Sequence, residues 1–102
     1  MSLRFKALDV VNVTESGIAY NGRCYFAGFF LGTDTVNDPI ITIYDNITNS
    51  GTELIPTNTY SARVKGMNGV EIGGSLINAY KGIYVEITCS GEVEVVVLYR
   101  AF

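Results

Sequence analysis

The chain has 102 residues, of which 48% are apolar and 17% are charged, so it is long enough for one domain with a modest core and too apolar for a disordered tail. Ten acidic residues outnumber seven basic ones, and the basic residues are scattered, whereas nucleic-acid binding needs a concentrated basic face. No apolar run reaches the roughly 18 residues of a transmembrane helix, and charges interrupt the N-terminal stretch where a secretory signal needs apolar residues. We therefore expect no nucleic acid and no membrane among its partners.

Runs of β-branched and aromatic residues, interrupted by Gly, Asn, Asp and Ser about every 8–12 positions, are typical of an all-β protein. They predict a single antiparallel β-sandwich or β-barrel-like domain of about 7–8 strands over residues 1–102. Within residues 1–13, a first strand at 3–13 is expected to be available for pairing with a neighbouring molecule. The pair Asn21-Gly22 predicts a type I′ turn that joins strands at 17–20 and 23–32 into a hairpin.

In the middle of the chain, alternating apolar residues predict strands at 40–45 and 60–65. Polar loops are expected at 33–39, 46–52 and 66–74. The last loop is rich in glycine, but it lacks the spacing of a phosphate-binding loop and no helix follows it. We therefore expect no nucleotide cofactor there.

The last third of the chain contains the clearest alternation, with apolar residues at every second position of 83–89 and again of 93–99. If these two sets share one face of a hairpin, Cys89 pairs with Val93 around a three-residue loop. Gly91 in that loop would supply the left-handed backbone conformation that such loops need.

The outer face of this predicted hairpin is apolar at its far end. The pairing places Tyr84 opposite Leu98 and Glu86 opposite Val96. Apolar residues on both sides of a strand are typical of a covered central strand or of an interface. Together with Tyr80, which precedes the hairpin, Tyr84, Val96 and Leu98 are our predicted interaction surface.

Two groups of acidic and amide side chains could be interpreted as metal or catalytic sites. The first group surrounds the predicted loop 33–39 and could suit calcium, but its spacing matches no known calcium loop and turns commonly use such residues. Its members are Asp34, Asn37, Asp38 and Asp45. The second group lies at one end of the predicted hairpin, on an exposed face where carboxylates keep ordinary acidity. Its members are Glu86, Glu92 and Glu94.

The two cysteines, Cys24 and Cys89, are too few for a disulfide framework and fit no zinc spacing. Histidine is absent from the chain, so neither thiol has the usual base that would activate it as a nucleophile. We expect both to be reduced and packed inward, and the sequence leaves open whether they lie close enough to bridge. In total, we expect no catalytic residue, no cofactor and no metal.

Tyrosines that the alternation places outside the core are the remaining signal for binding. They are Tyr20, Tyr25, Tyr44, Tyr80 and Tyr84. Exposed tyrosine is typical of protein interfaces and of sugar-binding platforms. Sugar platforms more often use tryptophan, which this chain lacks, so the composition favours contact with protein.

Five segments between Gly22 and Arg100 follow one another in a recognisable order. They are FFLGTD at 29–34, NDPIITIYDN at 37–46, SGTELIP at 50–56, KGIYVEITCSG at 81–91 and EVEVVVLYR at 92–100. In this succession the chain resembles a family of small all-β virion structural proteins of tailed bacteriophages, of the head decoration (cement) or fibre type. The shared motifs are structural, so no functional residue carries over.

The resemblance implies a non-enzymatic virion structural protein. The first expectation is a capsid decoration protein that forms a homo-oligomer, with a trimer as one option, and bridges subunits of the phage major capsid protein. Such a protein would be made in the host bacterial cytoplasm and would reside on the capsid surface. The alternative is a tail- or fibre-associated module that binds a glycan or a protein of the host surface.

Overall fold

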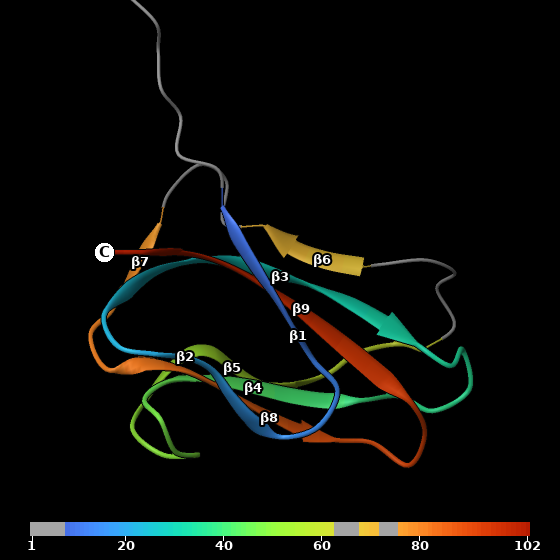
Figure 1. The fold of residues 1–102 in the computed structure, drawn as a ribbon. Helices are drawn as coiled ribbons and strands as arrows, with labels where there is room; N and C mark the ends of the chain where they lie inside the picture. The colour runs from blue at the N-terminus through green and yellow to red at the C-terminus, as the bar shows by residue number, and fades with distance from the viewer. Residues whose placement is uncertain (1–7, 63–67, 72–75) are drawn as a thin grey trace, which may run out of the picture.

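The computed structural model describes residues 8–62, 68–71 and 76–102, which form nine strands and no helix (Figure 1). The strands are β1 (Asp9–Val13), β2 (Gly17–Asn21), β3 (Cys24–Thr33), β4 (Ile40–Asp45), β5 (Thr52–Thr59), β6 (Asn68–Glu71), β7 (Ile77–Ala79), β8 (Gly82–Thr88) and β9 (Val93–Ala101). They are arranged in two antiparallel sheets packed against each other. The predicted antiparallel β-sandwich is therefore confirmed, with slightly more strands than expected.

The strand order shows how the chain is wound. Sheet A has the order β1-β9-β3, and both β6 and β7 pair with the free side of β3; sheet B has the order β2-β8-β4-β5. Strands pair from the outside of the sequence inward, β1 with β9, β2 with β8, β3 with β7 and β4 with β5. A long hairpin wound into two facing sheets in this way is a jelly roll.

The predicted hairpin at Asn21-Gly22 is wrong, because β2 belongs to sheet B and β3 to sheet A. Gly22 has a φ of 127°, but Asn21 does not have the positive φ that a type I′ turn also requires. The Gly22 amide instead donates a hydrogen bond of 3.1 Å to the Lys81 carbonyl. The turn therefore carries the chain from one sheet to the other.

The predicted C-terminal hairpin is also wrong. β8 pairs with β2 and β4, whereas β9 pairs with β1 and β3 in the opposite sheet. Tyr84 lies opposite Ile18 and Tyr44, and Leu98 lies opposite Val10 and Gly28. Both strands point their apolar residues into one core, but from its two sides, and alternation alone does not distinguish the two arrangements.

Other predicted elements had mixed outcomes. The strand at 40–45 is confirmed as β4, with the predicted ends. The strand predicted at 3–13 is present from Asp9, as the edge strand β1 of sheet A, and its residues before Leu8 lie outside the described residues. β5 was not predicted. β6 lies within the expected loop 66–74, and the remaining residues of that loop lie outside the described residues. Residues 60–62 of the strand predicted at 60–65 are not in a strand, and the rest lie outside the described residues.

The core lies between the two sheets and is built from large apolar side chains with almost no exposed surface. The largest are Phe26, Phe29, Leu31, Ile41, Ile43, Ile83, Val85, Val95 and Val97. A β-bulge between Phe26 and Gly28 adds one residue to β3. Because of it, Phe26 and Phe29 both point inward although they are three residues apart, and Phe30 points outward.

The two cysteines lie at opposite ends of the sandwich. Cys24 pairs with Ala79 and Ala101 at the start of β3, whereas the Cys89 thiol lies 3.7 Å from the Asn37 carbonyl, beyond the end of that strand. A ten-residue strand spans about 30 Å, and a disulfide needs Cα atoms within about 7 Å. The two thiols therefore do not bridge within one chain.

We expect the two thiols to react with a disulfide reagent at very different rates. Burial, with a smaller contribution from the charge of Asp45, raises the pKa of Cys24 to about 11, and its side chain is fully buried. Cys89 is half-buried. Titration at pH 8 should modify about one thiol per native chain quickly and the second only on unfolding, and Cys89→Ser should remove the fast phase. A fast phase that persists in Cys89→Ser would contradict this placement.

Candidate functional site

The outer face of sheet B mixes polar side chains with two exposed isoleucines, Ile18 and Ile40. Thr42 and Thr57 share a hydrogen bond of 2.7 Å across β4 and β5, and the Asn49 side chain donates one of 2.9 Å to Glu86 of β8. Tyr44 lies beside Glu86 and Glu53, and desolvation together with these charges raises the pKa of its phenol. These polar groups therefore already have partners in the chain.

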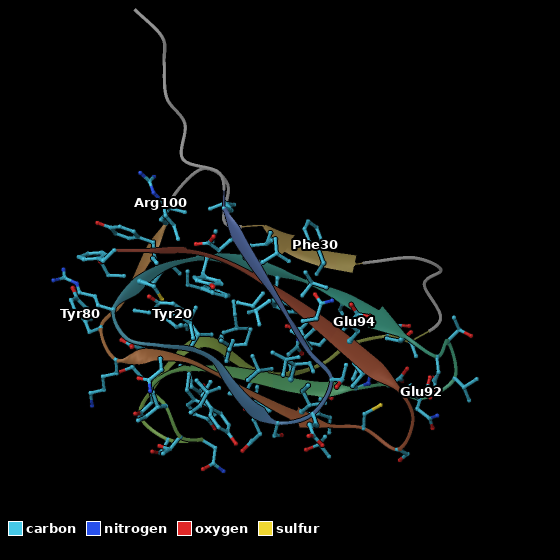
Figure 2. All side chains as sticks on the ribbon, viewed as in Figure 1. Tyr20, Phe30, Tyr80, Glu92, Glu94 and Arg100 are labelled. Atoms are coloured by element: carbon cyan, nitrogen blue, oxygen red, sulfur yellow. The ribbon has the colours of Figure 1, made fainter. Side chains whose placement is uncertain are left out.

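The outer face of sheet A has an apolar centre, which we call the sheet A patch. Its members are Val10 of β1, Phe30 of β3, and Val96 and Leu98 of β9. Val96 lies between Asn12 and Phe30 in one row across the sheet, and Leu98 lies between Val10 and Gly28 in the next row. Figure 2 shows Phe30 on sheet A and Tyr20 between the two sheets.

The exposure of these residues shows that the sheet A patch is separate from the core. Val10 is 58% exposed and Phe30 is 37% exposed, which is high for large apolar side chains in the strands of a sandwich. Val96 is only 8% exposed, but it is not part of the core cluster between the sheets. It is paired with Asn12 on one side and with Phe30 on the other. A contiguous apolar surface on an otherwise satisfied fold is typical of an interaction site.

Opposite charges stand at the two ends of the sheet A patch. Along β9, the residues that share the outward side of Val96 and Leu98 are Glu94 at one end and Arg100 at the other, both half-exposed. Glu94 pairs with Gly32, and Arg100 pairs with Tyr25. Figure 2 shows Arg100 and Glu94 far apart along the sheet.

A depression of about 540 Å³ lies at the acidic end. It is lined by Thr14, Gly32, Thr33, Asp34, Gly91, Glu92, Val93 and Glu94. Three carboxylates make it electronegative, but one of them, that of Asp34, already accepts hydrogen bonds from the surrounding loops. Among the described residues, no group of three acidic, cysteine or histidine side chains is placed to hold a metal ion.

Asp34 fixes two loops to each other. Its carboxylate accepts hydrogen bonds from the backbone amides of Val36 (2.9 Å) and Asn37 (2.8 Å) and from the Asn37 side chain (2.7 Å). The backbone amide of Glu92, across the depression, is a fourth donor. These bonds to the ionised form lower the pKa of Asp34 to about 2. The expected turn chemistry is therefore confirmed for Asp34. Asp38 and Asp45 instead accept bonds from the distant backbone amides of Ala62 and Lys81, so they join separate segments of the chain.

We expect Asp34 to stabilise the fold in a pH-dependent way. Its pKa is about 2 in the native state and about 3.9 in an unfolded chain, so its contribution is fully present above pH 4 and is lost as the pH falls towards 2. Asp34→Asn should therefore lower the stability at pH 6 and flatten its dependence on pH between 4 and 2. Urea unfolding at pH 6, 4, 3 and 2 measures both effects. Parallel curves for the two proteins would contradict this role.

Aromatic side chains gather at the basic end. The Arg23 guanidinium lies 4.1 Å from the ring centre of Phe102 and 5.3 Å from that of Tyr80, and Tyr25 stacks on Phe102 at 4.7 Å. Tyr80 is 65% exposed, in the turn between β7 and β8. The cation–π contacts hold Arg23 between the two exposed rings.

The structure does not bring the four predicted surface residues together. Val96 and Leu98 are neighbours on the outer face of sheet A, whereas Tyr84 lies on the outer face of sheet B, and Tyr80 lies in a turn at the end of the sandwich. The separation follows from the wrong hairpin, because β8 and β9 are not in the same sheet. Whether Val96 and Leu98 bind a partner stays a prediction. The sequence reasoning missed Val10 and Phe30, whose places depend on the register of β1 and on the bulge in β3.

The three predicted glutamates are also separated. Glu86 lies on the outer face of sheet B, where it accepts the bond from Asn49, while Glu92 and Glu94 line the depression. Of the tyrosines expected outside the core, Tyr20 instead packs against the core, with its ring centre 4.8 Å from that of Tyr99. Alternation misplaces Tyr20 because a bulge in β2 shifts the register between Ile18 and Tyr20.

Comparisons with protein-family models, with curated proteins and with solved structures find no significant match to this chain. In the described part of the chain, no helix has the length and apolarity needed to cross a membrane. The site is therefore interpreted from its own residues, and the sheet A patch, with Glu94 and Arg100 at its two ends, is the candidate functional site.

Proposed function

We propose that this protein is a non-enzymatic structural component of a tailed-phage virion, which decorates the capsid as a homo-oligomer and bridges subunits of the major capsid protein. The observation that carries the self-association is the sheet A patch, where Val10 and Phe30 expose apolar surface around Val96. The virion role rests on the resemblance of the five segments between Gly22 and Arg100 to phage structural proteins.

The fold is compatible with this role but is not specific to it. Jelly rolls form viral capsid domains and also lectins, so the function has to be argued from the surface. A decoration protein occurs in many copies on one particle, and contacts that are weak singly are strengthened when they are made together. A patch of modest size is therefore sufficient for a protein that works on a repeating shell.

Sedimentation with capsids tests the proposal. Capsids of the phage that encodes this protein, prepared without it, should carry the wild-type protein into the pellet. Leu98→Asp in the sheet A patch should weaken this binding, because copies that no longer self-associate lose the gain from simultaneous contacts. The matched control is Ile18→Asp, which places the same charge at an exposed apolar position of sheet B and should leave binding intact. Wild-type protein that stays in the supernatant at saturating concentrations would refute the proposal.

One observation favours a second candidate, a tail- or fibre-associated module that binds a glycan or a protein of the host surface. Arg23, between the exposed rings of Tyr80 and Phe102, combines hydrogen-bond donors with aromatic faces, which are the groups that sugar-binding surfaces use. A glycan array should then show binding by the wild-type protein that Tyr80→Ala removes and Leu98→Asp leaves unchanged. Such a result, without capsid binding, would replace the decoration role.

A further inference from the structure

Along its outward side, β9 carries an acidic residue, two apolar residues and a basic residue in succession. Glu94, Val96, Leu98 and Arg100 occupy successive outward positions, and β9 lies between β1 and β3, so this row runs along the middle of the sheet face. Six residues of strand span about 20 Å, which is too far for Glu94 and Arg100 of one chain to pair. The order of charges reverses when the strand is turned end to end, and the apolar pair in the middle stays in the middle.

The neighbouring strand β3 shows a matching alternation of size. Opposite Arg100, Leu98, Val96 and Glu94, in that order, β3 places Tyr25, Gly28, Phe30 and Gly32. An aromatic residue is thus followed by glycine, twice, along the same face. When β3 is turned end to end about the same midpoint, each aromatic residue falls over a glycine: Phe30 over Gly28, and Tyr25 over Gly32.

We propose that a second copy of this chain packs face to face on the sheet A patch. The two copies are related by a two-fold axis that lies in the plane between their apposed sheets A. The axis runs perpendicular to β9, above the midpoint between Val96 and Leu98. Glu94 of each copy then faces Arg100 of the other, and Phe30 of each copy lies over Gly28 of the other. Every contact occurs twice, as in any isologous interface. This inference rests on the self-association included in the proposed function and names its surface and geometry.

The charges favour this axis over a two-fold axis parallel to β9, which would also bring the two faces together with their strands aligned. A two-fold axis parallel to β9 would place Glu94 against Glu94 and Arg100 against Arg100, and it would place Phe30 over Asn12. Like charges facing each other across an interface are unfavourable. A ring of three copies would bring this patch against a different surface, and its self-complementary charges and shapes would be unused.

The size of the face predicts a weak dimer. Four neighbouring strands span about 15–20 Å, and the nine residues of β9 span about 30 Å, so each copy would bury about 500 Å². The total, about 1,000 Å², is at the lower limit for a specific interface. We therefore expect dimers to form in the micromolar range in solution, and more completely where many copies are held close together on one particle.

Charge exchange between Glu94 and Arg100 tests the geometry. Sedimentation equilibrium should show the wild-type protein passing from monomer to dimer between about 1 μM and 1 mM. Glu94→Arg and Arg100→Glu should each weaken the dimer about tenfold, because each places two pairs of like charges in the interface. An equimolar mixture of the two variants should dimerise again, since in the mixed dimer each introduced arginine faces an introduced glutamate and the native pair remains. The double variant should also recover the dimer.

Controls separate this inference from folding defects and from the capsid role. Circular dichroism and thermal unfolding of each variant should match the wild type, and Glu53→Arg on sheet B, the same change of charge away from the patch, should leave the dimer intact. Wild-type protein that remains monomeric at 1 mM, or a mixture that does not dimerise more than its components, would overturn the inference. Capsid binding by a monomeric wild type would overturn the dimer alone, whereas a dimer that ignores capsids would refute only the decoration role.

Discussion

Phe29→Ala should lower the free energy of unfolding by about 3–5 kcal/mol, whereas the same change at the adjacent Phe30 should lower it by about 1 kcal/mol or less. Phe29 is 1% exposed and packs in the core, with its ring edge-on to Tyr60 at 5.7 Å between ring centres. Phe30 lies on the outer face of sheet A and covers Val96. Removing Phe29 therefore leaves a cavity in a close-packed interior, and removing Phe30 leaves a space that water fills.

Urea unfolding of the two variants at the same temperature measures this difference. The measurement should be made at protein concentrations near 1 μM. At higher concentrations, association through the sheet A patch would add stability to the wild type and to Phe29→Ala but not to Phe30→Ala. Since the two phenylalanines are neighbours in sequence, each variant is the control for the other. Equal losses, or a larger loss for Phe30→Ala, would mean that the bulge in β3 has been placed wrongly.

The same bulge explains why the sequence could not decide between these two residues. The sequence leaves open whether Phe29 or Phe30 belongs to the core, and strict alternation from Phe26 would put residues 28 and 30, not 29, on the side of Phe26. The extra residue between Phe26 and Gly28 reverses this order. The glycine inside the strand was the available signal, because glycine in a strand often marks a bulge, but it does not fix where the register shifts.

Alternation predicted which residues face inward far better than which strands are neighbours. Ile83, Val85, Val95 and Val97 are all in the core, as the pattern indicated. The pattern also suggested that their strands form a hairpin, because two apolar faces on one side of a sheet and two apolar faces meeting across a core have the same periodicity. The winding of the jelly roll depends on pairings between residues up to about 90 positions apart, such as β1 with β9, and no local signal encodes them.

The candidate site was partly visible for a similar reason. Val96 and Leu98 stood out because β9 is apolar on both sides, which a single strand can show. Val10 and Phe30 join them only through the register of two other strands. The match between Glu94 and Arg100, and between the aromatic residues and glycines of β3, depends on the whole sheet. This match therefore depends on the strand register of the folded sheet, which local patterns in the sequence do not determine.

Gly82→Ala should lower the free energy of unfolding by about 3 kcal/mol or more, because β2 and β8 approach too closely there for a side chain. Gly82 has a φ of 149°, and a Cβ atom at this position would lie 2.5 Å from the carbonyl oxygen of Tyr20 and 3.1 Å from the Ile47 side chain. The oxygen belongs to the backbone of the paired strand, so it can move away only if the two strands separate. The matched control is Gly17→Ala at the other end of the same strand pair, where the nearest atom is 3.8 Å away; it should change stability by about 1 kcal/mol or less.

Urea unfolding of both variants measures the difference, and a Gly82→Ala protein that fails to fold while Gly17→Ala folds normally would be the extreme form of the expected result. If the two variants were equally stable, the close approach of β2 and β8, and with it the junction between the two sheets at Gly22, would have to be reconsidered.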